Sequence, residues 1–212
     1  NATKLKFDDY FVQEGLAFRF TPFNYKKWGD AEGDNGYAID TEKFYENVMN
    51  RYKYGGLDTP GLYLDETTMR ICYSHRRLFA QLAKELVKQG DNARAQKVLA
   101  YAEQAIPAYN VPQVYESGSY EIATAYASIG ESGKAITLLN DLIAESRDYI
   151  DWAFSLGDSR IAMVQRDCLY KFWQWNQCNE LLKDMDKERY QQSNRQFEEK
   201  YMRLAQLMNY QN

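Results

Sequence analysis

The sequence of 212 residues predicts a mainly helical fold with a small β element at its N-terminus. Before residue 40, one stretch alternates apolar and polar residues, which is the two-residue period of a strand. After residue 40, apolar residues recur every three or four positions, which is the period of a helix. One turn pattern is also written twice, at Gly90-Asp-Asn-Ala-Arg-Ala95 and, forty residues later, at Gly130-Glu-Ser-Gly-Lys-Ala135. In each copy a glycine ends one apolar run and a polar residue opens the next, so we expect helix pairs that repeat along the chain.

Residues 1–39 are predicted to form a β-containing cover rather than a separate domain. Leu16, Phe18 and Phe20 alternate with small or polar residues, which predicts a strand that is buried on one face. The stretch from 36 to 40 can form a second short strand. Two such strands are not stable alone, so we expect this segment to pack on the helices.

Residues 40–212 are predicted to form the helical repeat domain, and the cover and this domain are expected to make one folding unit. The expected helices run from Asp40 to the glycines at 55 and 56, then over 66–89, 93–106, 114–129, 132–148, 158–175, from Cys178 onward, and over 190–210. The third pair is degenerate, with a break expected between Trp175 and Cys178. The final helix has one apolar face and one charged face, which is typical of a helix that closes a repeat stack.

These repeats resemble tetratricopeptide units, although their period is longer and the small-Gly-Tyr-Ala pattern is only partly kept. The resemblance implies a tetratricopeptide-like stack of α-α pairs with a concave face. Stacks of this kind commonly serve binding rather than catalysis, which is an analogy at the level of the fold.

Composition and motifs exclude several classes of function. The net charge of -4 argues against a dedicated nucleic-acid binder. No apolar run approaches the roughly 20 residues that span a bilayer. The sequence begins at Asn1 without a Met and contains no secretory signal pattern, so we expect a mature chain or an excised domain. The sequence has no Gly-rich phosphate loop, HExxH, GxSxG or EF-hand motif. We therefore predict no catalytic residue, no cofactor and no metal site.

Cys72, Cys168 and Cys178 form no CxxC pair, and one histidine cannot complete a zinc site with them at the usual spacings. They are predicted to be buried free thiols without a disulfide. Cys178, at the start of its own helix, is expected to lie too far from Cys168 for a bridge.

The helix predicted over 66–89 carries two further candidate features. Its expected core stripe is Ile71, Cys72, His75, Leu78, Phe79, Leu82 and Leu86. On that stripe His75 is interpreted as a structural histidine that hydrogen-bonds the N-terminal cover. Asp65 and Glu66 are predicted to cap the helix start rather than to form a glycosidase pair.

Basic residues of the same helix form a candidate binding face. They are Arg70, Arg77, Lys84 and Lys88, spaced seven, seven and four apart. This is either a solvated face or a surface for an anionic partner.

Aromatic residues lie on the first helices of the second and third pairs. They are Tyr120, Tyr126, Tyr170, Trp173 and Trp175. Some must be core, while others can face a groove, where aromatic rings stack on sugars or anchor peptides. The predicted partner-binding residues, all off the core of the expected concave helices, are Arg77, Lys84, Tyr120 and Arg166.

Two stretches resemble one particular family. They are Tyr10-Phe-Val-Gln-Glu-Gly-Leu-Ala-Phe-Arg-Phe-Thr-Pro22, and Tyr54-Gly-Gly-Leu-Asp-Thr-Pro60 continuing through Tyr63-Leu-Asp-Glu66, Arg70 and His75-Arg-Arg77. They look like the soluble C-terminal region of a family of large bacterial membrane proteins of unknown function, whose membrane part is similar to protein O-mannosyltransferases. The resemblance covers nearly the whole chain and is closest from 10 to 80.

The resemblance implies the tail of a membrane glycosyltransferase-like protein, in the periplasm or elsewhere on the extracytoplasmic face of the membrane. The acidic residues that carry glycosyl transfer would lie in the membrane part, so this chain is not expected to be an enzyme. We expect a non-catalytic interaction module that binds a protein or glycan partner and meets the membrane only through an upstream segment. The alternatives are a stand-alone carbohydrate-binding helical-repeat protein of the cell envelope, or an enzyme with an unfamiliar site. The sequence leaves the oligomeric state open.

Overall fold

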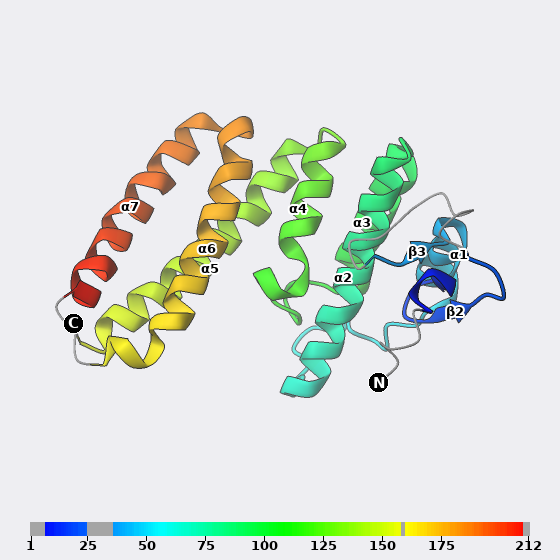
Figure 1. Ribbon diagram of the computed structural model, residues 1–212, viewed down its shortest axis with the longest axis horizontal. Helices are drawn as coiled ribbons and strands as arrows, with labels where there is room; N and C mark the ends of the chain where they lie inside the picture. The colour runs from blue at the N-terminus through cyan, green and yellow to red at the C-terminus, as the bar shows by residue number, and fades with distance from the viewer. Residues whose placement is uncertain (1–6, 25–35, 158–159, 210–212) are drawn as a thin grey trace. The chain divides into compact units, whose positions relative to one another are not determined.

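The computed structural model describes residues 7–24, 36–157 and 160–209 (Figure 1). These residues are mainly helical and include a small three-stranded sheet near the N-terminus, which confirms the predicted fold class at this coarser level. The strands are β1 (Phe11–Gln13), β2 (Phe18–Phe20) and β3 (Ala38–Ile39). The helices are α1 (Thr41–Glu46), α2 (Glu66–Lys88), α3 (Asn92–Ala105), α4 (Ser119–Ser128), α5 (Ser132–Ser155), α6 (Ile161–Met185) and α7 (Lys187–Asn209).

The chain divides into two compact units, residues 1–112 and 113–212. The first unit holds the sheet and α1 to α3, and the second holds α4 to α7. The sequence predicts one folding unit, made of a cover over 1–39 and a repeat domain over 40–212. This division stays a prediction. None of the helices in the described ranges is both long and apolar enough to cross a bilayer.

The sheet of the first unit has the order β2-β1-β3, with β2 antiparallel and β3 parallel to β1. The predicted half-burial of Leu16, Phe18 and Phe20 is wrong, because 51%, 43% and 55% of these residues' surfaces are exposed. Arg19 is only partly exposed instead and pairs with Glu14. Arg19 lies opposite the buried Val12 in the sheet, and since successive side chains of a strand point to opposite faces, Phe18 and Phe20 lie on the other face, where they contact Tyr37 and Phe11.

Both repeated turns form as the sequence predicts. Gly90 and Gly130 have φ of 78° and 86°, a left-handed conformation that favours glycine. The following amides, of Asp91 and Glu131, donate to carbonyls five residues back, at Leu86 and Tyr126. This is the Schellman arrangement, which satisfies the last carbonyls of a helix and reverses the chain.

The cap at the start of α2 is also confirmed. The Asp65 carboxylate accepts hydrogen bonds from the backbone amides of Thr67 and Thr68. The hydrogen bonds from Thr68 lower the pKa of Asp65 below its ordinary value. Glu66 instead pairs with Arg70, one turn along the helix.

The third helix pair differs from the prediction. The expected break between Trp175 and Cys178 is absent, because α6 runs without interruption from Ile161 to Met185. Trp175 and Cys178 are both fully buried, three residues apart on one face, and neither glycine nor proline lies between them. The partner of α6 is therefore α7, which begins after Asp186 caps it by accepting from the amide of Arg189.

The prediction of the core stripe of α2 is partly wrong. Ile71 is 54% exposed, whereas Arg76, an unpredicted core residue, is 2% exposed. The Arg76 guanidinium donates to the carbonyls of Ile106, Val111 and Pro112 at 3.1, 2.6 and 2.7 Å. It thereby holds the segment after α3 against α2.

Candidate functional site

The four predicted binding residues divide between the two units. Arg77 and Lys84 lie on α2 of the first unit, where Arg77 is exposed and Lys84 is half-buried. Tyr120 lies on α4 and Arg166 on α6 of the second unit. A single face that contains all four residues therefore stays a prediction.

The basic face of α2 is less positive than its sequence indicates. Arg70 is 2.5 Å from the Glu66 carboxylate, and Lys88 is 2.7 Å from the Glu85 carboxylate. Both acids belong to the same helix as their partners. Arg77 donates to the Ser74 hydroxyl at 3.0 Å.

The second unit carries a continuous set of contacting rings, the aromatic strip, formed by Tyr115, Tyr120, Tyr170 and Trp173. Tyr115 stacks on Tyr120 at 5.2 Å between ring centroids and meets Trp173 edge to face at 5.3 Å. Trp173 in turn stacks on Tyr170 at 5.5 Å, with 17° between the ring planes.

Exposure separates the aromatic residues that the sequence could not separate. Tyr170 and Trp173 are each 46% exposed, whereas Tyr126 and Trp175 lie in the core at 1% and 0%. Arg166, also exposed, precedes Tyr170 by four residues and Trp173 by seven, so the three share one face of α6. The strip therefore exposes two large aromatic rings, with the exposed Arg166 on the same face of the helix.

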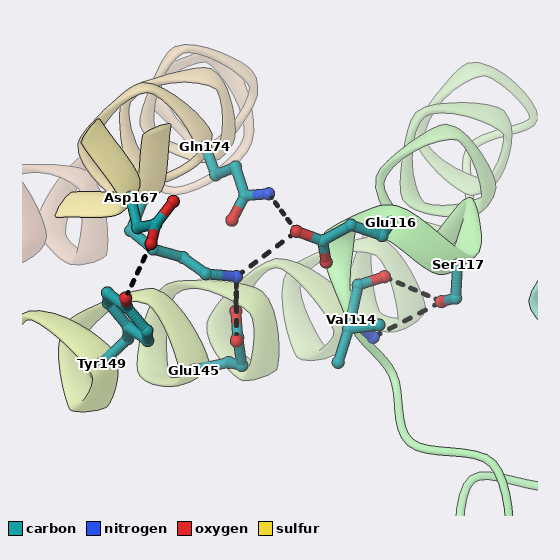
Figure 2. Close-up of polar contacts among 8 residues, drawn as sticks. Val114, Glu116, Ser117, Glu145, Tyr149, Asp167 and Gln174 are labelled. Carbon is teal, nitrogen blue, oxygen red and sulfur yellow. Dashed lines mark hydrogen bonds and ion pairs between the residues drawn. The ribbon is translucent and has the colours of Figure 1, made fainter. Parts of the chain in front are cut away.

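An ion cluster formed by Glu116, Glu145, Lys171 and Gln174 lies beside the strip. Figure 2 shows Glu116, Glu145 and Gln174 converging from three segments of the unit. Lys171 Nζ is 2.9 Å from a Glu145 oxygen and 3.5 Å from a Glu116 oxygen. The Gln174 amide donates to Glu116 at 2.8 Å. The alternation of Tyr170, Lys171, Trp173 and Gln174 along α6 thus joins the strip to the cluster.

Local backbone structure positions the first of these carboxylates. A 3₁₀ turn at Tyr115–Ser117 carries Tyr115 into the strip and Glu116 into the cluster. The Ser117 hydroxyl donates to the Val114 carbonyl at 2.7 Å and holds the turn (Figure 2). Gly118 then takes φ of 84° and lets α4 begin at once.

The electrostatics of the ion cluster favour its ionised form. Burial acts to raise the pKa of Glu116, but the hydrogen bond from Gln174 and the charge of Lys171 together lower it below the ordinary value. Glu116 is therefore a carboxylate at neutral pH. A general acid needs a raised pKa, so this glutamate is suited to hydrogen bonding rather than to proton donation.

The three cysteines are buried free thiols, as the sequence predicts. Cys168 and Cys178 lie in the same helix, ten residues and about 15 Å apart. They are too far apart for a disulfide, as predicted, but the prediction that they lie on separate helices is wrong. Burial raises the pKa of all three thiols, and that of Cys178 to about 12. Neutral thiols of this kind are poor nucleophiles.

His75 is only half-buried, with the edges of its ring against Tyr52 and Tyr54. The predicted hydrogen bond to the cover is not found among the described residues, and the buried Nδ1 of His75 has no partner there. Burial lowers the pKa of His75 and keeps the ring neutral. Within the same described ranges, no group of three or more His, Cys, Asp or Glu side chains is arranged to hold a metal ion.

No protein-family model, curated protein or solved structure matches this chain. The geometry of its own residues therefore carries the functional argument. The i, i+4, i+7 spacing of Arg166, Tyr170 and Trp173 indicates from the sequence alone that the three residues share one face of a helix. The ion cluster had no such signal, because it joins residues 55 and 58 positions apart.

Proposed function

We propose that this chain is a non-catalytic binding module and that the aromatic strip is its contact surface for a partner. The observation that carries this proposal is the exposure of Tyr170 and Trp173, two large rings stacked side by side on α6. Trp and Tyr rings in such positions bury much area at a small cost in side-chain entropy when a partner covers them. Arg166 adds a residue type that is enriched at energetically important contacts.

The ion cluster supports this role by holding the surface rigid. Lys171 and Gln174 alternate along α6 with the two exposed rings, and their bonds to Glu116 and Glu145 tie this helix to two other segments. A surface that is ordered before binding loses less conformational entropy when it binds.

The wider role that we propose follows from the resemblance of the sequence. The chain is a tetratricopeptide-like helical stack at the extracytoplasmic end of a membrane glycosyltransferase-like protein, where it binds a protein or glycan partner. Any glycosyl transfer belongs to the membrane part.

A second candidate is a stand-alone carbohydrate-binding protein of the cell envelope. The exposure of Tyr170 and Trp173 favours it, because the face of an exposed aromatic ring can stack on the face of a sugar ring. The two candidates make different predictions for soluble oligosaccharides, which bind by themselves only in the second.

The test is a double substitution, Tyr170→Ala with Trp173→Ala, against a matched control, Met202→Ala. Met202 is 61% exposed and lies on α7 instead of α6. Each variant, with its fold checked by circular dichroism, is probed on an oligosaccharide array and by photo-cross-linking in envelope extract. Loss of cross-linked partners in the double variant alone supports the interaction module, and loss of array binding alone supports the carbohydrate binder. Equal binding by all variants would rule out the strip as the contact surface.

A further inference from the structure

A second candidate surface of unit 113–212 lies between α5 and α7. A groove of about 700 Å³ opens there, and we call it the amide groove. Its walls are one face of each helix: Asn140, Ile143 and Arg147 on α5, and Gln192, Ser193 and Gln196 on α7. The spacing of three or four residues keeps each set on a single side of its helix.

Three amide side chains line this groove without internal partners. In the described part of the chain, the side-chain amides of Asn140, Gln192 and Gln196 make no hydrogen bond to another side chain or to a backbone group. Each amide carries two N–H donors and one carbonyl acceptor. The groove therefore offers both kinds of hydrogen-bonding group from both walls.

The floor of the groove is fixed by a buried chain of hydrogen bonds. The indole N–H of Trp175 donates to the Ser193 hydroxyl at 2.7 Å, and that hydroxyl donates to Asn179 Oδ1 at 2.6 Å. Trp175 and Asn179 are fully buried, and Ser193 is 9% exposed. These two hydrogen bonds tie α7 to α6 at Ser193, which lines the groove.

The charges that line the groove indicate which classes of ligand it can bind. Arg147 and Arg189 balance Asp186 and Glu188 along its lining, so the groove does not attract a polyanion such as nucleic acid. Arg189 pairs with Asp186 at 3.0 Å, but the nearest acid to Arg147 is Asp148 at 3.8 Å. Arg147 is therefore the better placed of the two for an added carboxylate. The described lining contains no aromatic ring, which disfavours a stacked sugar.

We infer that the amide groove binds a short segment of another polypeptide in extended conformation. An extended backbone alternates N–H and C=O groups, which match the donors and acceptors of Asn140, Gln192 and Gln196. From Asn140 to Arg147 the wall rises seven residues, or about 10 Å, which is the length of roughly three extended residues. Midway along this wall, Ile143 offers an apolar contact to one side chain of the bound peptide. At the end of the wall, Arg147 can pair with a carboxylate of the peptide.

The experiment is a selection of randomised heptapeptides, displayed on phage, against the immobilised chain. Enriched peptides are synthesised and titrated by calorimetry against the parent chain and against Gln192→Ala with Gln196→Ala. We expect about a tenfold loss of affinity in this variant, since two hydrogen bonds are removed. Arg147→Ala is expected to weaken only those peptides that carry an acidic residue or a terminal carboxylate at the matching end.

Gln191→Ala is the matched control, because Gln191 is exposed, neighbours Gln192 and does not line the groove. The Tyr170→Ala, Trp173→Ala variant must also keep its peptide affinity, which separates this groove from the aromatic strip. The inference is overturned if no peptide is enriched, or if the enriched peptides bind the Gln192→Ala, Gln196→Ala variant as tightly as the parent chain. It is equally overturned if the groove variants change only the self-association of the chain in sedimentation velocity.

Discussion

The ammonium of Lys171 lies 2.9 and 3.0 Å from the two carboxylate oxygens of Glu145, an ion pair that ties α6 to α5. The Lys171 side chain is only 11% exposed, so its charge is largely withdrawn from water. An ion pair of this kind depends on both partners, because removal of one leaves a poorly hydrated charge behind. This relationship supports the rigidity that we assign to the aromatic strip.

Lys171→Met is expected to destabilise the protein by about 1–2 kcal/mol, since Glu116 and Glu145 lose their shared counter-charge while keeping part of their exposure to water. Urea denaturation at pH 7 measures the change. Lys183→Met on the same helix is the control, as Lys183 is exposed and its ammonium lies over the Tyr190 ring, 5.8 Å from the ring centroid. Equal losses in both variants would mean that the ion cluster has no special role.

The pH dependence of stability follows from Glu116. Its pKa in the folded state lies below the ordinary value of 4.5. The unfolded chain therefore takes up a proton first as the pH falls. The stabilisation is fully present above pH 4.5 and is lost as the pH falls through the folded pKa. In Glu116→Gln, the free energy of unfolding should fall less steeply than in the parent between pH 5 and pH 3, roughly the range in which carboxylates titrate. An unchanged slope would contradict this assignment.

Arg76→Met should be one of the most damaging single substitutions in the first unit, costing about 2–4 kcal/mol. The carbonyls of Ile106, Val111 and Pro112 lose a donor in the variant. Arg77→Met, at the adjacent exposed position, should change stability by less than about 0.5 kcal/mol. Chemical denaturation of the two variants side by side measures the difference. A similar small effect in both would show that the buried guanidinium is dispensable.

His75 is expected to make the protein less stable as the pH falls below 6.5. Burial lowers its folded pKa below the ordinary 6.5, so the unfolded chain binds a proton that the folded chain does not. His75→Phe keeps a ring against Tyr52 and Tyr54 and removes the titration. Melting temperatures at pH 7.5 and 5.5 should therefore converge in the variant relative to the parent. A parent protein with no loss of stability between these two values would refute the prediction.

The cysteines should react slowly in the folded protein and completely in the unfolded one. All three are buried and their pKa values are raised, so little thiolate is present at pH 8. A thiol reagent added without a reductant should find three thiols after denaturation. A count of one would reveal a disulfide.

Charge reversals distinguish the two faces that carry the predicted binding residues. Arg166→Glu should weaken partner binding through the aromatic strip. Arg77→Glu with Lys84→Glu should weaken it only if α2 also contributes. The electrostatic part of either effect should shrink as salt rises, because exposed charges are screened over about 8–10 Å at physiological ionic strength. Binding at low and high salt, measured with folded variants, decides between the faces.

Several features followed from the sequence by itself because neighbouring residues produce them. Gly90 and Gly130 end helices, since only glycine takes their positive φ without strain, and Asp65 caps α2 through amides two and three residues away. The change from strand to helix period near residue 40 is equally local. These interactions need no distant partner, so a short window of sequence contains their whole cause.

Other features were decided only by tertiary structure. The continuity of α6 through Trp175 and Cys178 rests on a core that buries both residues, and the exposure of Phe18 follows from the pairing of β2 with β1, which sets Arg19 opposite the buried Val12. From the sequence alone Arg76 is expected on the surface. In the fold its guanidinium is buried, because it donates to carbonyls 30 to 36 positions later in the chain. The ion cluster and the amide groove likewise join residues far apart in the chain. Their energies depend on burial and on the alignment of separate helices, and no periodicity or spacing within one helix encodes either quantity.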